Sequence, residues 1–260
     1  MWSAETVAVV ALTFFIGGFV KGVVGLGLPS ISLAALTATL GLHPAMALVL
    51  APSLATNLLQ ATRGGHGKAV VRRLWPYLLA AALGIWLGVR ILVVTDAALL
   101  SKLLGVMIVV YSLLSLARFK PCVRPSLEAW IAPPLGVING VLTGLTGAFV
   151  VPSVFYLQAL GLERDVLVQA MGIMFLFSTV GMVLALGSQA FITVNLALLS
   201  SAAAIPAMGG MVIGQRLSGR LAEAMFKKLL FAAQLFLGLY ILVRRYRIAV
   251  SCQYKSVRCI

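Results

Sequence analysis

Two short stretches of the sequence hold most of the residues that could do chemistry in a helical protein. Each is a glycine cluster followed by a proline, which are Gly18-x3-Gly22-x2-Gly25-x-Gly27-x-Pro29 and Gly136-x3-Gly140-x3-Gly144-x2-Gly147-x4-Pro152. Glycine tolerates unwound backbone and proline lacks a backbone donor, so such a cluster can interrupt a helix. A helix that restarts after the break exposes N–H groups that attract anions. The two breaks could therefore face one anion site.

Polar side chains recur around both breaks. Lys21 is the charged residue among them. Its side chain could reach to the membrane surface, or it could supply a cation that compensates a bound anion. Serine and threonine commonly bond their own backbone, and glycine pairs can serve helix packing alone, so these alternatives stay open. The candidate substrate-binding residues are Lys21, Gly22, Gly25, Gly27, Ser30, Asn57, Gln60, Asn139, Gly140, Thr143, Gly144, Thr146, Gly147 and Gln158.

The acidic residues and the histidines indicate no cation-binding, metal-binding or catalytic site. All six acidic residues fall in loops or at expected helix ends, and the two histidines have no second ligand at metal-binding spacing. A cationic substrate would meet only Lys21 and Arg90 within the apolar stretches, and both would repel it. Nucleophile and phosphate-loop signatures are absent from the sequence. We expect no metal, no cofactor and no enzymatic activity.

The composition indicates which kind of molecule must position these residues. Of the 260 residues, 62% are hydrophobic and 10% are charged, with a formal net charge of +14. A soluble domain of this size would lack the polar surface to cover so much apolar side chain. The excess positive charge sits mostly between apolar runs, as in cytoplasmic loops of membrane proteins, and does not indicate nucleic-acid binding. The chain is predicted to be an all-α, polytopic transmembrane helical bundle.

Eight apolar stretches are long enough, or nearly so, to cross a bilayer, which takes about 20 helical residues. They are Thr6–Val24, Ala45–Thr62, Leu74–Val94, Ala98–Ala117, Trp130–Ala148, Val166–Leu186, Ile192–Gly214 and Ala224–Val243. Two shorter stretches, Pro29–Leu40 and Val150–Leu160, follow the glycine clusters. These could be half-helices or thin crossings, because a helix rises only about 1.5 Å per residue.

The doubled motif predicts a repeat. We expect a first transmembrane repeat over residues 1–117, a basic cytoplasmic linker over 118–129, a second repeat over 130–243 and a basic C-terminal tail over 244–260. Five apolar segments in each half would place the halves in opposite orientation. Inverted repeats with interrupted helices are typical of secondary transporters.

The basic clusters leave the position of the termini open. With eight crossings both termini are cytoplasmic, and the cluster from Arg216 to Lys228 lies on the wrong side. With ten crossings both termini are outside, and the basic tail is the misfit. In either case the clusters around Arg72 and Arg124 lie inside.

At these residues the sequence resembles the sulfite exporter TauE/SafE family of membrane transporters. The resemblance rests on Gly18 to Gly27, on the Leu42-His43-Pro44-Ala45 stretch, on Asn57 to Gln60, and on Gly136 to Pro152 running into Leu162. It covers most of residues 5–243. Members commonly carry a richer glycine triplet, near which this sequence has Leu28, Ala148 and Phe149. The resemblance implies about eight transmembrane segments and movement of sulfite, sulfonates or related sulfur-containing organic anions.

We therefore expect a multi-pass transporter of the inner (plasma) membrane, and an exporter of such anions. A negative cytoplasm drives each negative charge outward with about 2.3 kcal/mol per 100 mV, which suffices without a coupling carboxylate. An anion channel is the first alternative, and a non-transporting scaffold or enzyme subunit follows it. The expected partners are a small anionic substrate and the lipid bilayer, with no nucleic acid, and homo-oligomerisation is left open.

Overall fold

The computed structural model describes residues 2–119, 121–218 and 223–243. The helical elements in these ranges are α1 (Ala4–Val24), α2 (Leu28–Leu40), α3 (Leu42–Leu48), α4 (Leu50–Thr62), α5 (Gly67–Val94), α6 (Ala97–Leu116), α7 (Pro125–Thr146), α8 (Ser153–Ala159), α9 (Arg164–Ser188), α10 (Val194–Leu217) and α11 (Glu223–Val243). The described residues contain no strand. The predicted all-α class is confirmed.

Eight spans are long and apolar enough to cross a membrane, and they coincide with the eight predicted ones. The predicted span from Ala45 to Thr62 is formed by α3 and α4 together, which meet at Val49. Helices α5 and α7 begin earlier than their apolar runs, at Gly67 and Pro125. Their first turns carry exposed polar side chains that a search for apolar runs leaves out.

The two short apolar stretches form short helices after backbone breaks. Gly25 and Gly27 have φ of 84° and 117°, and Gly147 has φ of 75°, a left-handed region that glycine enters without strain. A Cβ atom on Gly17 would lie 3.4 Å from Leu28 Cα, so α2 starts beside the middle of α1. Helix α8 has 7 residues, fewer than predicted, because 148–152 are not helical.

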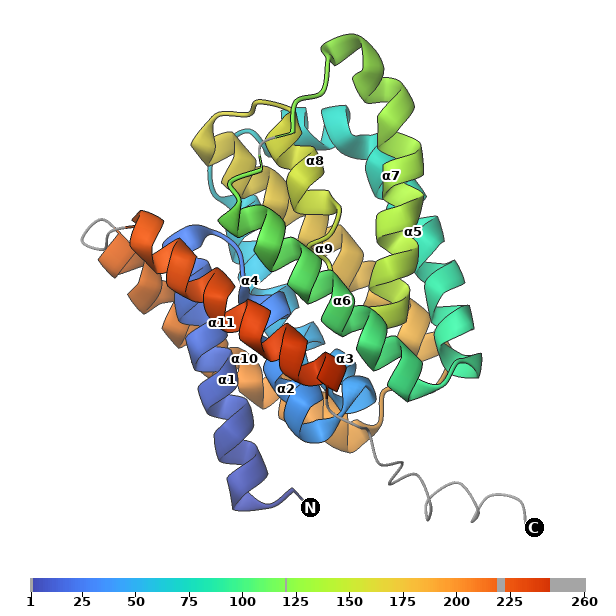
Figure 1. Ribbon diagram of the computed structural model, residues 1–260, viewed down its shortest axis with the longest axis vertical. Coiled ribbons are helices and arrows are strands. Elements are labelled where there is room, and N and C mark those ends of the chain that lie inside the picture. Colours follow the sequence, from blue (N-terminus) through green and yellow to red (C-terminus); the bar gives the residue numbers. More distant parts are fainter. Residues whose placement is uncertain (1, 120, 219–222, 244–260) are drawn as a thin grey trace.

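Contacts between distant segments show which helix ends lie together. Arg63 at the end of α4 bonds Gln215 near the end of α10, and Ser218 bonds the carbonyl of Val23 at the end of α1. At the same end of the bundle, Gln169 in α9 holds the loop between α4 and α5. Three groups of described basic residues lie near this end, which we call the basic end: Arg63, Lys68, Arg72 and Arg73 where α4 leads into α5, Arg118 and Arg124 between α6 and α7, and Arg216, Lys227 and Lys228 near the end of α10 and the start of α11 (Figure 1).

The opposite end of the bundle holds the start of α1 and the end of α11. Helices α1 and α10 run parallel, because Phe15 lies against Gly210 and Phe19 against Gly214. In the last turn of α11, Leu242 packs near Gly105 in the first half of α6. The chain thus runs along the bundle in ten passes of alternating direction, eight of them long and two, α2 and α8, only partial. The sequence left open whether the chain ends lie on the same side as the basic clusters or on the opposite side. In the fold, the start of α1 and the end of α11 both lie opposite the basic end.

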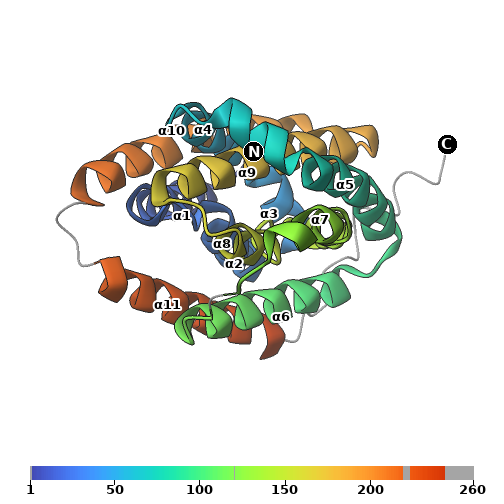
Figure 2. The same cartoon turned by 90° about the horizontal axis from the view of Figure 1, so that it is seen from above.

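The helices form three layers when seen from above (Figure 2). Helices α6 and α11 pack together on one side, and α4, α5, α9 and α10 lie on the other, with α1, α2, α7 and α8 between them. The packing exchanges elements between the halves of the chain, since α1 packs mainly on α10 and α7 mainly on α5. An inverted duplication would produce this exchange. The duplication itself and the predicted unit boundaries stay predictions, and the tail over 244–260 lies outside the described residues.

Candidate functional site

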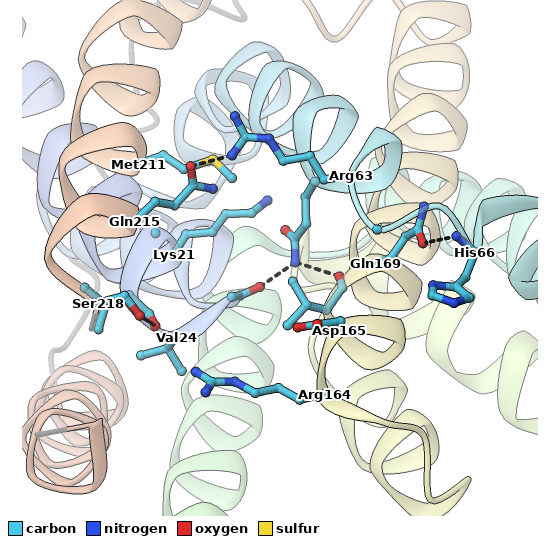
Figure 3. A pocket seen from close by; sticks show the side chains of 16 residues that line it. Lys21, Val24, Arg63, His66, Arg164, Asp165, Gln169, Met211, Gln215 and Ser218 are labelled. Carbon is cyan, nitrogen blue, oxygen red and sulfur yellow. Dashed lines mark hydrogen bonds between the residues drawn. The ribbon is translucent and has the colours of Figure 1, made fainter. Parts of the chain in front are cut away.

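A cavity of about 440 Å³ opens beside the first glycine–proline break, at the basic end of the bundle. Its walls come from the end of α1, the end of α4 with the loop that follows, the start of α9 and the end of α10 (Figure 3). Ligand pockets in proteins commonly have volumes of about 300–1,000 Å³. The lining residues are Lys21, Gly22, Val23, Val24, Gly25, Gln60, Arg63, Gly64, His66, Arg164, Asp165, Val168, Gln169, Met211, Gln215 and Ser218.

Lys21 reaches this cavity from within the bundle and is 1% exposed. Its Nζ donates to Thr56 Oγ1 at 3.2 Å and to Asn57 Oδ1. Asn57 in turn donates through Nδ2 to Thr179 Oγ1 on α9 at 3.3 Å. An ammonium group has three donors, so two of them hold the side chain in place and the third is left for a ligand. The burial excludes the alternative in which Lys21 reaches to the membrane surface.

Gln60 fixes the backbone break at the mouth of the cavity. Its Nε2 donates to the carbonyl of Gly25 and to that of Val168, both at 2.8 Å, which ties the end of α1 to α9. Gly25 adopts a left-handed conformation, and a Cβ there would lie 3.2 Å from Val168. The other amide atom, Gln60 Oε1, is buried without a hydrogen-bond partner.

The charge and donor groups of the cavity favour an anion. Lys21, Arg63 and Arg164 line it, against Asp165 as the acidic lining residue. The lining also includes the neutral polar side chains of Gln169, Gln215 and Ser218. Charged donors in a site partly shielded from water bind oxyanions more strongly than neutral donors do. Among the described residues, no three His, Cys, Asp or Glu side chains come together as they would in a metal site.

The predicted site residues of the first half divide between the cavity and its surroundings. Lys21, Gly22, Gly25 and Gln60 line the cavity, and Asn57 holds Lys21 without lining it. Gly27 and Ser30 lie at the start of α2, where Ser30 Oγ donates to the Gly27 carbonyl and accepts from Gln234 Nε2 at 2.7 Å. These two lie outside the cavity lining.

The second break does not reach this cavity. Thr143 Oγ1 donates to the Ala148 carbonyl at 3.1 Å, and Thr146 Oγ1 donates to the Leu142 carbonyl at 2.7 Å. A Cβ on Gly147 would lie 2.9 Å from Met46 Cγ in α3, so the second break packs against the first half of the chain. Asn139 is buried with no partner for Oδ1 or Nδ2, whereas Gln158 is exposed.

Several glycines of the doubled motif serve close helix packing. A Cβ on Gly22 would overlap the Met211 carbonyl of α10, and a Cβ on Gly140 would overlap the Ala81 carbonyl of α5. Gly144 lies in the same way against α5, where a Cβ would be 2.6 Å from the Ile85 carbonyl. The partner glycines are Gly84 and Gly88 on α5 and Gly214 on α10. For these motif glycines, the packing alternative accounts for the contacts in the structure.

Most polar residues of the cavity wall were not among the site residues predicted from the sequence, and they include Arg63, Arg164 and Gln215. Arg63 follows Gln60 by three residues, a spacing that brings helical residues to one face. Gln215 follows Gly214, and Gly214 packs against Gly22 beside Lys21. Pairing the two glycine motifs would therefore have brought Gln215 to the site.

Comparison with protein families identifies the chain. The model of the family described as Sulfite exporter TauE/SafE matches residues 10–241, which includes both glycine–proline breaks and every wall of the cavity. Comparisons with curated proteins and with solved structures gave no match. The chain belongs to the sulfite exporter TauE/SafE family and is a multi-pass membrane transporter of that family.

Proposed function

We propose that this TauE/SafE family member exports small anions such as sulfite, organosulfonates or related sulfur-containing organic anions across the inner (plasma) membrane. The observation that carries the proposal is the buried Lys21 ammonium at the wall of a cavity with two further cations. Bringing an anion out of water is costly unless opposite charge and hydrogen-bond donors replace its hydration. Lys21 supplies that charge, and its bonds to Thr56 and Asn57 hold the ammonium in position for the anion.

The position of the cavity supports export. Basic loops of membrane proteins concentrate on the cytoplasmic side, and the cavity opens at the basic end of the bundle. The site in this conformation therefore loads from the cytoplasm. A membrane potential that is negative inside then drives the bound anion outward, with about 2.3 kcal/mol for each charge at 100 mV.

Flux through purified protein tests the proposal. We expect proteoliposomes to take up sulfite and methanesulfonate in a saturable manner, at a rate that follows an imposed potassium-diffusion potential. The Lys21→Met variant keeps the length of the side chain and removes its charge, so its flux should fall to the level of empty liposomes. Lys102→Met is the matched control, because Lys102 is exposed on α6 outside the cavity lining.

Three outcomes would count against the proposal. Full flux through correctly inserted Lys21→Met would remove Lys21 from the transport site. Equal losses in Lys21→Met and Lys102→Met would show a general effect of charge. Absence of flux for every anion, from folded wild-type protein, would favour a scaffold or an enzyme subunit.

A further inference from the structure

Arg63 lies at the mouth of the cavity, and its side chain reaches across the mouth to α10. It follows the last residue of α4, and its Nη1 donates to Gln215 Oε1 on α10 at 2.6 Å. Figure 3 shows this bridge and, beneath it in that view, the side chain of Lys21. The two cations line the same cavity, although they extend from different helices.

The backbone around Arg63 is held firmly by Gln169. Gln169 Oε1 accepts from the His66 amide at 2.9 Å, and Gln169 Nε2 donates to the Ala61 carbonyl at 2.8 Å. Gly64 has φ of 109°, and a Cβ there would lie 2.8 Å from Gln169 Oε1, so the turn needs glycine. The loop is thus clamped on both sides of Arg63, while the Arg63 side chain is exposed at the mouth. A fixed backbone with an exposed head group allows the guanidinium to change partners without moving the loop.

The guanidinium has donors to spare for a ligand. It carries five N–H groups in a planar fork, and the bridge to Gln215 uses one of them. Gln215 is a neutral acceptor, whereas an oxyanion accepts two parallel, charge-assisted bonds from arginine. Asp165, the acidic residue among the described lining residues, makes no ion pair with Arg63. An oxyanion in the cavity would therefore compete well against Gln215 for the fork.

We propose that Arg63 is the specificity-determining residue of the anion site and that Gln215 holds it while the site is empty. On binding, the guanidinium leaves Gln215 and donates two bonds to oxygen atoms of the anion, which also faces Lys21. The inference rests on the proposed anion transport and adds to it a selection rule. Anions with a planar pair of oxygens, such as sulfonates, are favoured over spherical halides, because only the former match the fork.

Proteoliposome flux of methanesulfonate, with chloride as competitor, tests this rule. Arg63→Lys keeps the charge and removes the fork, so the half-saturating methanesulfonate concentration should rise about tenfold, the size of one charge-assisted hydrogen bond. The inhibition constant of chloride should be nearly unchanged in the same variant. Gln215→Leu removes the acceptor that competes for the guanidinium, so the half-saturating methanesulfonate concentration of this variant should fall. Arg72→Lys, an exposed residue outside the cavity lining, is the matched control and should behave as wild type.

The half-saturating methanesulfonate concentration is expected to rise in Arg63→Lys and to fall in Gln215→Leu, and these opposite shifts distinguish a role in specificity from a structural role. If the Arg63–Gln215 bridge only held α4 to α10, then Arg63→Lys and Gln215→Leu would lower flux together and lower the thermal unfolding midpoint together. That result would overturn the inference. So would unchanged methanesulfonate affinity in Arg63→Lys while Lys21→Met abolishes flux, a result that leaves the proposed function standing. Loss of all wild-type flux would instead contradict the proposed function.

Discussion

At the scale of single residues, the site depends on one buried ammonium group and the side chains that hold it. Lys21, Asn57 and Gln60 could be predicted from the sequence, because a cation and two amides within apolar stretches are costly to leave unpaired. The bridge from Arg63 to Gln215 could not be predicted. That contact joins residues far apart in the chain, and it forms because α4 and α10 pack together and bring their ends to the same place.

The coupling between Lys21 and Asn57 gives a prediction at this scale. Asn57→Leu leaves the ammonium with Thr56 as its acceptor, and the loss of one hydrogen bond to a charged group costs about 1.5–3 kcal/mol. We expect a lower thermal unfolding midpoint in detergent for Asn57→Leu. Adding Lys21→Met should recover part of that loss, because the double variant has no buried charge to satisfy. A double-mutant cycle measures the coupling, and strictly additive effects would contradict the bond.

At the scale of helices, two parallel pairs frame the bundle. Gly22 of α1 lies against Gly214 of α10, and two glycines of α7 lie against two of α5. The sequence predicted both that glycine pairs pack helices and that glycine clusters interrupt them. The structure shows that one motif does both, since Gly22 packs on α10 while Gly25, three residues later, turns the chain. Which glycine does which depends on the partner helix, and a motif alone does not name that partner.

Adjacent glycines in α10 allow a matched test of this packing. A Cβ on Gly210 would overlap the Phe15 carbonyl of α1, whereas a Cβ on Gly209 would meet nothing within 4 Å. Gly210→Ala should therefore lower the thermal unfolding midpoint and the yield of folded protein. Gly209→Ala should be neutral or stabilising, because alanine is favoured over glycine in a helix by about 1 kcal/mol. Equal midpoints for the two variants would show that α1 and α10 do not pack in this way.

At the scale of the whole molecule, the fold places three groups of described basic residues and the cavity mouth at one end of the bundle. The sequence predicted the eight long spans but left the side of the termini open, because two short segments could count as crossings or not. The depth of a short segment depends on its tertiary contacts. Leu28 starts α2 beside the middle of α1, a placement that no hydropathy pattern reports.

Thiol labelling in intact cells tests this orientation. Cys122 is exposed in the loop between α6 and α7 at the basic end, and Gln189 is exposed at the end of α9 on the opposite side. With Cys252 and Cys259 replaced by serine, a membrane-impermeant maleimide should label Cys122 only after permeabilisation. With Cys122 also replaced, Gln189→Cys should be labelled in intact cells. The reverse pattern would turn the cavity mouth outward and contradict loading from the cytoplasm.

Counterflow is the most direct test of the central claim that the Lys21 cavity belongs to an anion carrier. Proteoliposomes are loaded with unlabelled sulfite and then given a trace of radiolabelled sulfite outside. A carrier that alternates between the two sides exchanges one for the other, so we expect preloading to accelerate tracer uptake in wild type. Lys21→Met should show no such acceleration. Rapid tracer uptake that is the same with and without preloading would instead indicate an open pore, and the carrier account would be wrong.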